Sequence, residues 1–462
     1  MEGQDRYTVT YRANETRQVM KWIKAGQCGS IIGLRGAGKS NFNRFLLRTN
    51  VQQRYLGQNQ ANFTFVLINL LSLTERSEWG LYEMILNNLF VQLHPPDIAD
   101  EMILEVSALH HEMMHTRDVL TAERAVERCV ALLCQQPDWR LVLLFDEFDA
   151  VFRDLPAALF RCLRAIRDSY KDQISYIVVA THDLTGLRHD LTEEMDHFYR
   201  LVRRNLCWLG PYCEADARQM TGYLASRRSQ ELSEKDTARL YELSGGHAGL
   251  LKAILSLLWN GNDLGQFSKL TPMPAAPSRH PFENESAIVS ECQKIWDSLS
   301  EDEKADLSTF ANGDLLAEHA IKHLIVRGLL CQGEDNSQFI CSPLLASFIE
   351  KQAPSPQKGT YISRSPRIVQ LAGQRIEILT ELEFELLCYL YEQRERVCTK
   401  YDLIENVYRQ QYNYRKAGLS DEMLQALISR LREKIEPDRE HPEYILTVRG
   451  EGYRFKEPDT NR

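Results

Sequence analysis

The chain has 462 residues, a formal net charge of -9 and a pI near 5.8. A chain of this length holds roughly two to four domains and buries a sizeable core. Its acidic balance argues against coating nucleic acid over the whole surface, although a local DNA-reading element remains compatible with it. No signal peptide opens the chain, and no apolar run approaches the ~20 residues that span a bilayer. We therefore expect a cytoplasmic protein with no membrane partner.

The cysteines also bear on the compartment. There are 11 of them, an odd number, with no Cys-x-x-Cys pair. Several lie inside apolar segments, among them Cys129, Cys134 and Cys162. This pattern predicts reduced core thiols rather than a disulfide framework or a structural zinc site.

Residues 30–40 contain the most informative motif. Gly33, Gly38, Lys39 and Ser40 fit the phosphate-loop pattern of a glycine, four residues, then Gly-Lys-Ser/Thr, directly after an apolar strand. Glycines let the backbone turn its N–H groups towards phosphates, and the following helix offers its positive N-terminus to the same charge. The lysine is expected to reach the β- and γ-phosphates, and the serine hydroxyl to bind Mg²⁺. The pattern predicts an ATP/ADP site.

A second signature follows at the end of an apolar strand, residues 140–145, which precedes Asp146 and Glu147. An acid at the carboxyl end of a buried strand can hold Mg²⁺, so we assign Asp146 to the metal together with Ser40. Glu147 is expected to orient and polarise the attacking water, because phosphoryl transfer depends on positioning and charge stabilisation. Lys39, Asp146 and Glu147 are thus the predicted catalytic residues of an ATPase.

Residues 174–180 predict a further strand, and the residues that follow it, Thr181, His182 and Asp183, are candidate sensors of the γ-phosphate. Residues 198–209 are expected to form a fifth strand. Arg200 and Arg203 within it are candidates for an arginine finger acting across a subunit interface, or else solvated surface charge.

The expected strand order, with an extra strand between the phosphate loop and the acidic strand, resembles the AAA+ and STAND ATPases over roughly residues 7–262. Residues 214–260 resemble the helical lid of that group. Ala248 and Gly249 stand where the resemblance implies proline and arginine, which implies slow, regulatory hydrolysis, while His247 is expected to touch the nucleotide. The predicted nucleotide-binding residues are Gly33, Gly36, Gly38, Lys39, Ser40, Asn41, Thr181 and His247.

A proline-rich linker separates this part from two C-terminal modules. Ser300 to Glu303 form a capping box within a pattern of helices and a hairpin over residues 287–352. The order of these elements suggests a winged-helix module that binds DNA or packs on the ATPase; its acidic second helix favours packing.

Residues 367–457 closely resemble the OmpR/PhoB-type DNA-binding domain of response regulators. The resemblance rests on Leu-Thr-x-x-Glu-Phe at residues 379–384, Arg-Leu-Arg at 430–432 and Thr-Val-Arg-Gly-x-Gly-Tyr-Arg at 447–454. In the third predicted helix of this domain, residues 420–435, the apolar residues share one face, so the opposite face is free to enter a major groove. Arg430 can bind guanine bidentately, and Arg449 suits the minor groove. Ser429, Arg432 and Thr447 suit phosphates. The predicted DNA-binding residues are Gln425, Ser429, Arg430, Arg432, Thr447 and Arg449.

Together the patterns predict a multidomain chain of α/β plus α+β class: a P-loop NTPase parallel sheet with a helical lid, then two winged-helix domains. The expected boundaries are an ATPase core at 1–210, a lid at 211–262, a linker at 263–286, a winged-helix module at 287–352, a linker at 353–366 and a DNA-binding domain at 367–458.

The predicted function is a nucleotide-switched, DNA-binding transcription regulator that uses ATP/ADP and Mg²⁺. Its partners would be double-stranded DNA, further copies of the chain in the ATP state, and an unidentified protein or ligand inducer. Two alternatives stay open. One is an AAA+ ATPase acting on DNA in replication, transposition or anti-phage defence; the other is an interaction scaffold with a vestigial ATPase, against which the retained Lys39, Asp146 and Glu147 argue.

Overall fold

The computed structural model describes residues 7–93, 100–136, 138–184, 187–188, 193–259, 282–313, 316–333, 336–352, 361–364, 367–371, 374–376, 379–394, 396–408, 421–438, 441–448 and 450–456. The chain divides into two compact units. The first comprises Met1–Lys304 with His319–Phe348, and the second Ala305–Glu318 with Ile349–Arg462.

The first unit is built on a parallel sheet of five strands in the order β2-β3-β4-β1-β5. The strands are β1 (Gly29–Ile32), β2 (Phe63–Asn69), β3 (Arg140–Asp146), β4 (Ile174–Ala180) and β5 (Leu206–Trp208). Every residue of β1 and β4 is buried, as expected for strands of a parallel sheet that helices cover on both faces. Strand β4 lies between the phosphate-loop strand and the acidic strand, which confirms the predicted order.

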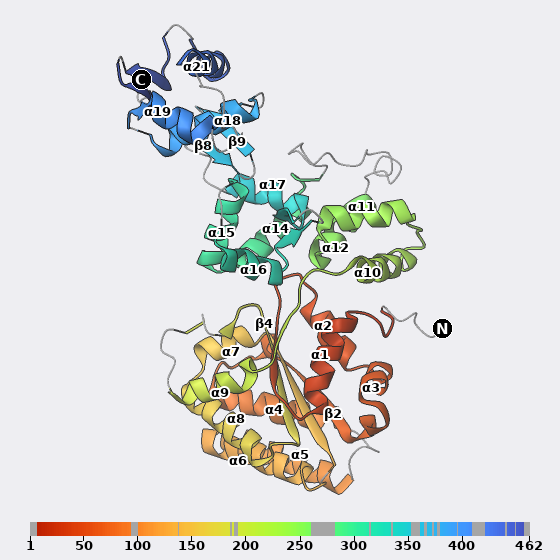
Figure 1. Ribbon diagram of the computed structural model, residues 1–462. Helices are drawn as coiled ribbons and strands as arrows, with labels where there is room; N and C mark the ends of the chain where they lie inside the picture. The colour runs from red at the N-terminus through yellow and green to blue at the C-terminus, as the bar shows by residue number, and fades with distance from the viewer. Residues whose placement is uncertain are drawn as a thin grey trace. The chain divides into compact units, whose positions relative to one another are not determined.

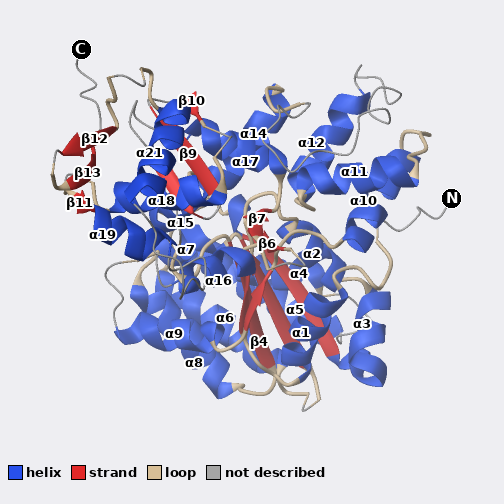
Figure 2. Ribbon diagram, turned by 45° about the horizontal axis from the view of Figure 1, so that its top comes forward, coloured by secondary structure: helices blue, strands red, loops and turns tan. Residues whose placement is uncertain are grey.

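Helices surround this sheet (Figures 1 and 2). They are α1 (Ala13–Lys24), α2 (Lys39–Leu46), α3 (Thr49–Leu56), α4 (Glu78–Gln92), α5 (Asp100–Thr116), α6 (Val119–Leu133), α7 (Phe148–Asp154), α8 (Ala157–Ser169) and α9 (Glu193–Arg203). Aromatic side chains fill the core between β3, β4 and the helices that follow them, including Phe145, Phe148, Phe160, Tyr176 and Phe198.

Helix α9 corrects one prediction. Residues 198–203 are helical, and the fifth strand is confined to Leu206–Trp208. Phe198, Tyr199 and Val202 are buried together, a spacing that suits one face of a helix rather than the alternation of a strand.

Three further helices follow the sheet: α10 (Glu214–Ser226), α11 (Glu234–Ser244) and α12 (Ala248–Trp259). A capping box between Ser233 and Asp236 begins α11, and Gly245 ends it in the left-handed conformation, with φ 57°. These three helices lie where the lid is predicted, and we refer to them as the lid.

The next elements are α14 (Ser286–Asp297), α15 (Glu301–Ala311), α16 (Glu318–Val326), β6 (Leu330–Gln332), β7 (Gln338–Ile340) and α17 (Pro343–Gln352). The predicted capping box is present, because the Ser300 N–H donates to Glu303 Oε2 over 2.9 Å and the Glu303 N–H to Ser300 Oγ over 3.1 Å. A disulfide between Cys331 and Cys341 joins the β6–β7 hairpin to the residue after it. The prediction that all cysteines are reduced is therefore wrong here, because the hairpin brings these two side chains together.

The second unit contains β8 (Tyr361–Arg364), β9 (Arg367–Leu371), β10 (Gln374–Arg375), α18 (Glu381–Glu392), β11 (Cys398–Thr399), α19 (Lys400–Leu403) with a π-helical turn to Tyr408, α21 (Asp421–Ile435), β12 (Ile445–Val448) and β13 (Gly452–Phe455). Capping boxes begin α18 at Thr380 and α19 at Thr399. Strands β11, β13 and β12 form the closing antiparallel sheet. This is the winged-helix domain that the sequence predicts.

Within the described part of the chain, no helix has the length and apolar character needed to cross a bilayer.

Candidate functional site

The phosphate loop leaves β1 at Ile32 and enters α2 at Lys39. Gly36 and Gly38 have φ angles of 80° and 92°, which residues other than glycine rarely adopt. A Cβ on Gly38 would lie 2.8 Å from Tyr212 Oη, and one on Gly36 would meet the imidazole of His247. Glycine is therefore required at both positions by conformation and by space.

Lys39 lies buried at the start of α2. Its Nζ donates to the carbonyl oxygens of Gly33 and Leu34 over 2.8 and 3.4 Å, and to Thr181 Oγ1 over 3.0 Å. Burial lowers the pKa of this amine, and the nearby carboxylates of Glu147, Asp149 and Asp146 oppose that shift. The lysine and the predicted sensor threonine are thus in direct contact.

The two predicted acids end β3. Asp146 is buried, and its Oδ1 accepts the N–H of Glu147 over 3.1 Å. Glu147 has a left-handed backbone with φ 59°, an uncommon conformation for a non-glycine residue that turns the chain sharply into α7. Burial raises the pKa of Glu147, and the positive charge of Lys39 reduces this rise in part. A carboxylate with a raised pKa is a better proton acceptor from water.

Asp149 is a site residue that the sequence patterns did not identify. Its carboxylate accepts the N–H of Thr181 over 2.8 Å and that of His182 over 3.0 Å, and its Oδ1 lies 3.2 Å from His182 Nδ1. Burial acts to raise the pKa of Asp149, but these hydrogen bonds outweigh it and the pKa is lowered. The sequence signal was an acid two residues after Glu147, and only the pairing of β3 with β4 gives it a partner.

The lid contacts the loop through His247, whose Nε2 lies 3.0 Å from the carbonyl oxygen of Arg35. A carbonyl only accepts, so Nε2 carries the hydrogen, and Nδ1 then accepts the N–H of Leu250 over 3.4 Å. Burial lowers the pKa of His247 to about 4, which keeps the imidazole neutral. The Gly249 N–H donates to the carbonyl of Gly36 over 3.1 Å, so the lid backbone also joins the phosphate loop.

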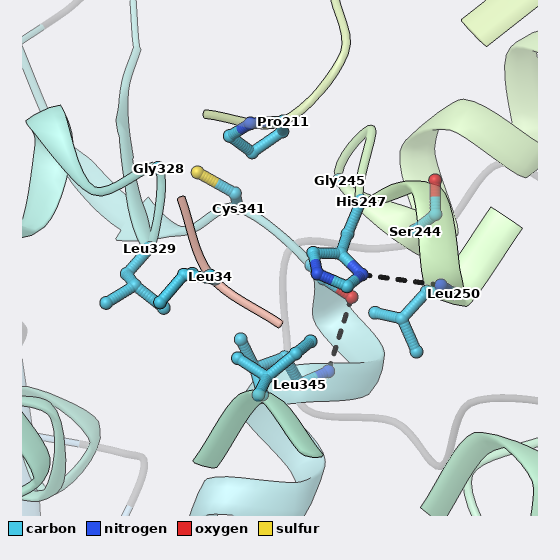
Figure 3. A pocket seen from close by; sticks show the side chains of 12 residues that line it. Leu34, Pro211, Ser244, Gly245, His247, Leu250, Gly328, Leu329, Cys341 and Leu345 are labelled. Carbon is cyan, nitrogen blue, oxygen red and sulfur yellow. Dashed lines mark hydrogen bonds between the residues drawn. The ribbon is translucent and has the colours of Figure 1, made fainter. Parts of the chain in front are cut away.

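A cavity of about 10 Å³ lies beside this contact (Figure 3). Leu34 of the loop, His247 of the lid and Leu345 of α17 line it. A space of this size holds no more than one water molecule. The three elements are therefore closely packed against one another.

Two buried arginines reach the same region, and the sequence patterns did not identify the second of them, Arg327. Arg12 donates to the carbonyl oxygens of Ala37 in the loop and Gly210 over 3.0 and 2.8 Å. Arg327, the residue after α16, donates from Nη1 to the carbonyl of Thr181 over 3.0 Å. Neither position belongs to a sequence motif.

Of the other predicted site residues, Ser40 and Asn41 lie in the first turn of α2. Arg200 and Arg203 lie on the exposed face of α9, with the Arg203 guanidinium 5.3 Å from the centre of the Tyr199 ring.

In the winged-helix domain, α21 buries Leu424, Leu427, Ile428, Leu431 and Ile435. Gln425 and Arg430 are exposed and Ser429 is partly exposed, as the predicted division of faces requires. Arg432 instead bonds within the domain, donating from Nε to the carbonyl of Ile445 over 3.0 Å and from Nη2 to Thr447 Oγ1 over 2.9 Å. Arg449 lies outside the described residues.

Comparison with known proteins identifies two separate regions of the chain. Residues 23–187 match the family model of the AAA domain, and residues 373–455 match that of the C-terminal domain of transcriptional regulatory proteins. The chain is 43% identical over 83 residues to the alkaline phosphatase synthesis transcriptional regulatory protein PhoP of Bacillus subtilis (strain 168), a match that covers 18% of this chain and 32% of that protein. The chain thus spans about a third of the length of that curated relative.

Among solved structures, the chain is similar to a Walker-type ATPase of Pyrococcus abyssi, with 15% identity, a TM-score of 0.46 and coverage of 73% of this chain and 95% of that one. It is also similar to the ORC1 protein of Aeropyrum pernix in complex with DNA, with 11% identity, a TM-score of 0.37 and coverage of 91% and 83%.

Proposed function

We propose that this chain, in which a P-loop ATPase domain of the AAA type precedes an OmpR/PhoB-type winged-helix domain, is a transcription regulator whose DNA binding is switched by ATP and ADP. The observation that carries the switch is the pair of contacts between the lid and the phosphate loop, from His247 to Arg35 and from Gly249 to Gly36. Because phosphates bind at this loop, a change in its occupancy alters the lid's contacts. Two arrangements of the lid would then differ in nucleotide affinity, as population shift requires.

The residues around the loop fit a nucleotide with Mg²⁺. The backbone at Gly36 and Gly38 leaves no room for side chains, Lys39 supplies a cation, and Ser40 and Asp146 are oxygen ligands of the kind that Mg²⁺ prefers. When bound, Mg²⁺ neutralises charge on the phosphates. Lys39 stabilises the developing charge and Glu147 orients the attacking water.

We assign the reading of DNA to α21. The exposed Gln425 and Arg430 and the partly exposed Ser429 face away from the core of the domain, where they can enter a major groove. Arg430 is suited to guanine, while Thr447 and the Arg449 position suit phosphate and minor-groove contacts. Arg432 bonds to Ile445 and Thr447 within the domain, so its role is to support the position of Thr447.

The domain boundaries are also retained as a proposal. The core, the lid and most of the module at 287–352 fall in the first compact unit, and the DNA-binding domain at 367–458 falls in the second. The switch therefore requires that the first unit pass its nucleotide state to the second.

The decisive experiment is selection of bound sequences from random duplex DNA by the full-length protein, once with ATP and Mg²⁺ and once with ADP. We expect a defined motif whose enrichment differs between the two nucleotides. Equal enrichment with ATP, with ADP and without nucleotide would refute the switch. Binding without any motif would favour an AAA+ machine that acts on DNA.

Two variants test the ATPase roles separately. Lys39→Ala should abolish nucleotide binding, whereas Glu147→Gln should retain binding and lose hydrolysis. Normal hydrolysis by Glu147→Gln would overturn the assignment of the water-orienting residue.

The exposure of Arg200 and Arg203 on α9 supports the second candidate function, an AAA+ machine whose subunits complete each other's sites. In that case Arg203→Ala abolishes hydrolysis only under conditions in which the protein is oligomeric, as measured by ATPase assays over a range of protein concentrations alongside light scattering.

A further inference from the structure

Arg327 is held at a fixed place at the end of α16. Its backbone N–H donates to the carbonyl of His323 over 2.9 Å, and only 4% of the residue is exposed. The next residue, Gly328, has φ 74° and lies so close to Pro211 that a Cβ would run into the proline ring. The turn after α16 is therefore packed against the segment that joins β5 to the lid.

From this turn the Arg327 guanidinium extends to the end of β4. Its Nη1 donates to the carbonyl of Thr181 over 3.0 Å, and its Cζ lies 5.5 Å from the centre of the Trp208 ring. A module that follows the lid in sequence thus places a cation beside the ATPase sheet.

Thr181 connects this arginine with the phosphate loop. Its hydroxyl accepts from Lys39 Nζ over 3.0 Å, its N–H donates to Asp149, and its carbonyl accepts from Arg327. The charge of Arg327 acts with burial to lower the pKa of Lys39, so the two cations are within electrostatic range of each other. Phosphates held by Lys39 would lie in the electric field of both cations.

Glu303 restrains the arginine. Its Oε1 accepts from Arg327 Nε over 2.6 Å and lies 2.9 Å from His323 Nε2, while its Oε2 accepts the N–H of Ser300. Burial acts to raise the pKa of Glu303, but its hydrogen bond to His323 and the charge of Arg327 lower it to about 2. The carboxylate is therefore ionised near neutral pH and compensates much of the arginine's charge.

We propose that Arg327 is the residue through which the module after the lid distinguishes ATP from ADP, by favouring the additional charge of the γ-phosphate next to Lys39 and Thr181. This inference rests on the proposed nucleotide site. Arg327 acts as a positioning and specificity residue, with Glu303 setting how much of its charge the nucleotide experiences. A nucleotide-dependent shift of the arginine between Glu303 and the phosphate is the differential contact that an allosteric switch needs.

The test measures the affinities for ADP and for a non-hydrolysable ATP analogue with Mg²⁺, by calorimetry on the full-length protein. Arg327→Gln removes the cation, so we expect the preference for the ATP analogue to fall about tenfold while ADP affinity changes little. Glu303→Gln removes the compensating carboxylate, so the preference for the ATP analogue should rise. Arg327→Lys keeps the charge and should retain most of the preference.

The two variants are expected to change the preference for the ATP analogue in opposite directions, which distinguishes a role in nucleotide discrimination from a purely structural one. Arg327→Gln and Glu303→Gln break the same ion pair, so damage to folding alone would change the nucleotide preference in the same direction or leave it unchanged, and either outcome would overturn the inference. If the wild type binds neither nucleotide, or Lys39→Ala binds as well as the wild type, the proposed function itself fails. Nucleotide binding by the wild type with an unaltered preference in both variants refutes the role of Arg327 alone.

Discussion

Acidification should open the contact between the lid and the phosphate loop, because the buried site of His247 favours the neutral ring over the charged one. Nε2–H donates to Arg35 and Nδ1 accepts the N–H of Leu250, so a proton on Nδ1 would face another N–H. Burial lowers the pKa from 6.5 to about 4, and the carboxylate of Glu291 opposes the shift only in part. The contact is therefore stable above pH 6.5 and weakens as the pH falls towards 4.

The size of the effect follows from the two pKa values. Once the lid is open, the imidazole titrates with its ordinary pKa. Between pH 7.5 and pH 5 the closed state then loses about 2 kcal/mol relative to the open state. This corresponds to a fall of about 30-fold in the protection of the lid amides that open with the contact.

Hydrogen–deuterium exchange of peptides covering residues 244–251, corrected for the intrinsic pH dependence of exchange, measures this protection. His247→Gln is the matched control, because its side-chain amide can still donate to the Arg35 carbonyl but does not titrate. We expect protection to depend on pH in the wild type and to stay constant in the variant. The same pH dependence in both proteins would refute the assignment of the neutral tautomer.

Three further outcomes are expected. Asp149→Asn should lower kcat for ATP about 10- to 100-fold with ATP affinity nearly unchanged, because one amide oxygen replaces the two carboxylate oxygens that accept the N–H groups of Thr181 and His182; an unchanged kcat in a steady-state ATPase assay would contradict this. Cys331→Ser should destabilise the first unit by about 3 kcal/mol, because the disulfide closes a segment with a sequence separation of 10. In denaturant unfolding, Cys341→Ser and the reduced wild type should show the same loss of stability as Cys331→Ser. Coincident unfolding curves for the oxidised and reduced wild type would contradict a stabilising role of the disulfide. Arg430→Ala should weaken binding to the selected DNA motif about 10- to 100-fold. Its affinity for unrelated DNA should hardly change in fluorescence anisotropy, and an equal loss on both DNAs would assign Arg430 to phosphate.

The amino-acid sequence by itself determined the features that depend on neighbours along the chain. The phosphate loop ends in Lys39 at the start of a helix, and Asp146 closes a buried strand, as their local patterns predict. The capping boxes at Ser300 and Thr380 form where the three-residue spacing predicts them. The same holds for the buried face of α21, because helical periodicity is itself a local property.

The short range of these patterns also explains where sequence reasoning went wrong. Residues 198–203 are apolar and aromatic enough for a strand, and only their packing as α9 shows which period applies. Cys331 and Cys341 lie far enough apart that their pairing depended on the register of β6 with β7.

Only the tertiary structure decided which side chains surround the phosphate loop. Asp149 reaches Thr181 because β3 pairs with β4, and Arg327 reaches it across a sequence separation of 146. Single polar residues of this kind carry no periodic or spaced signal, since their partners are supplied by the order of strands and the packing of helices. The phosphate-loop residues are therefore determined by the local sequence. The contacts that connect this loop to the rest of the molecule form only when segments distant in sequence pack together.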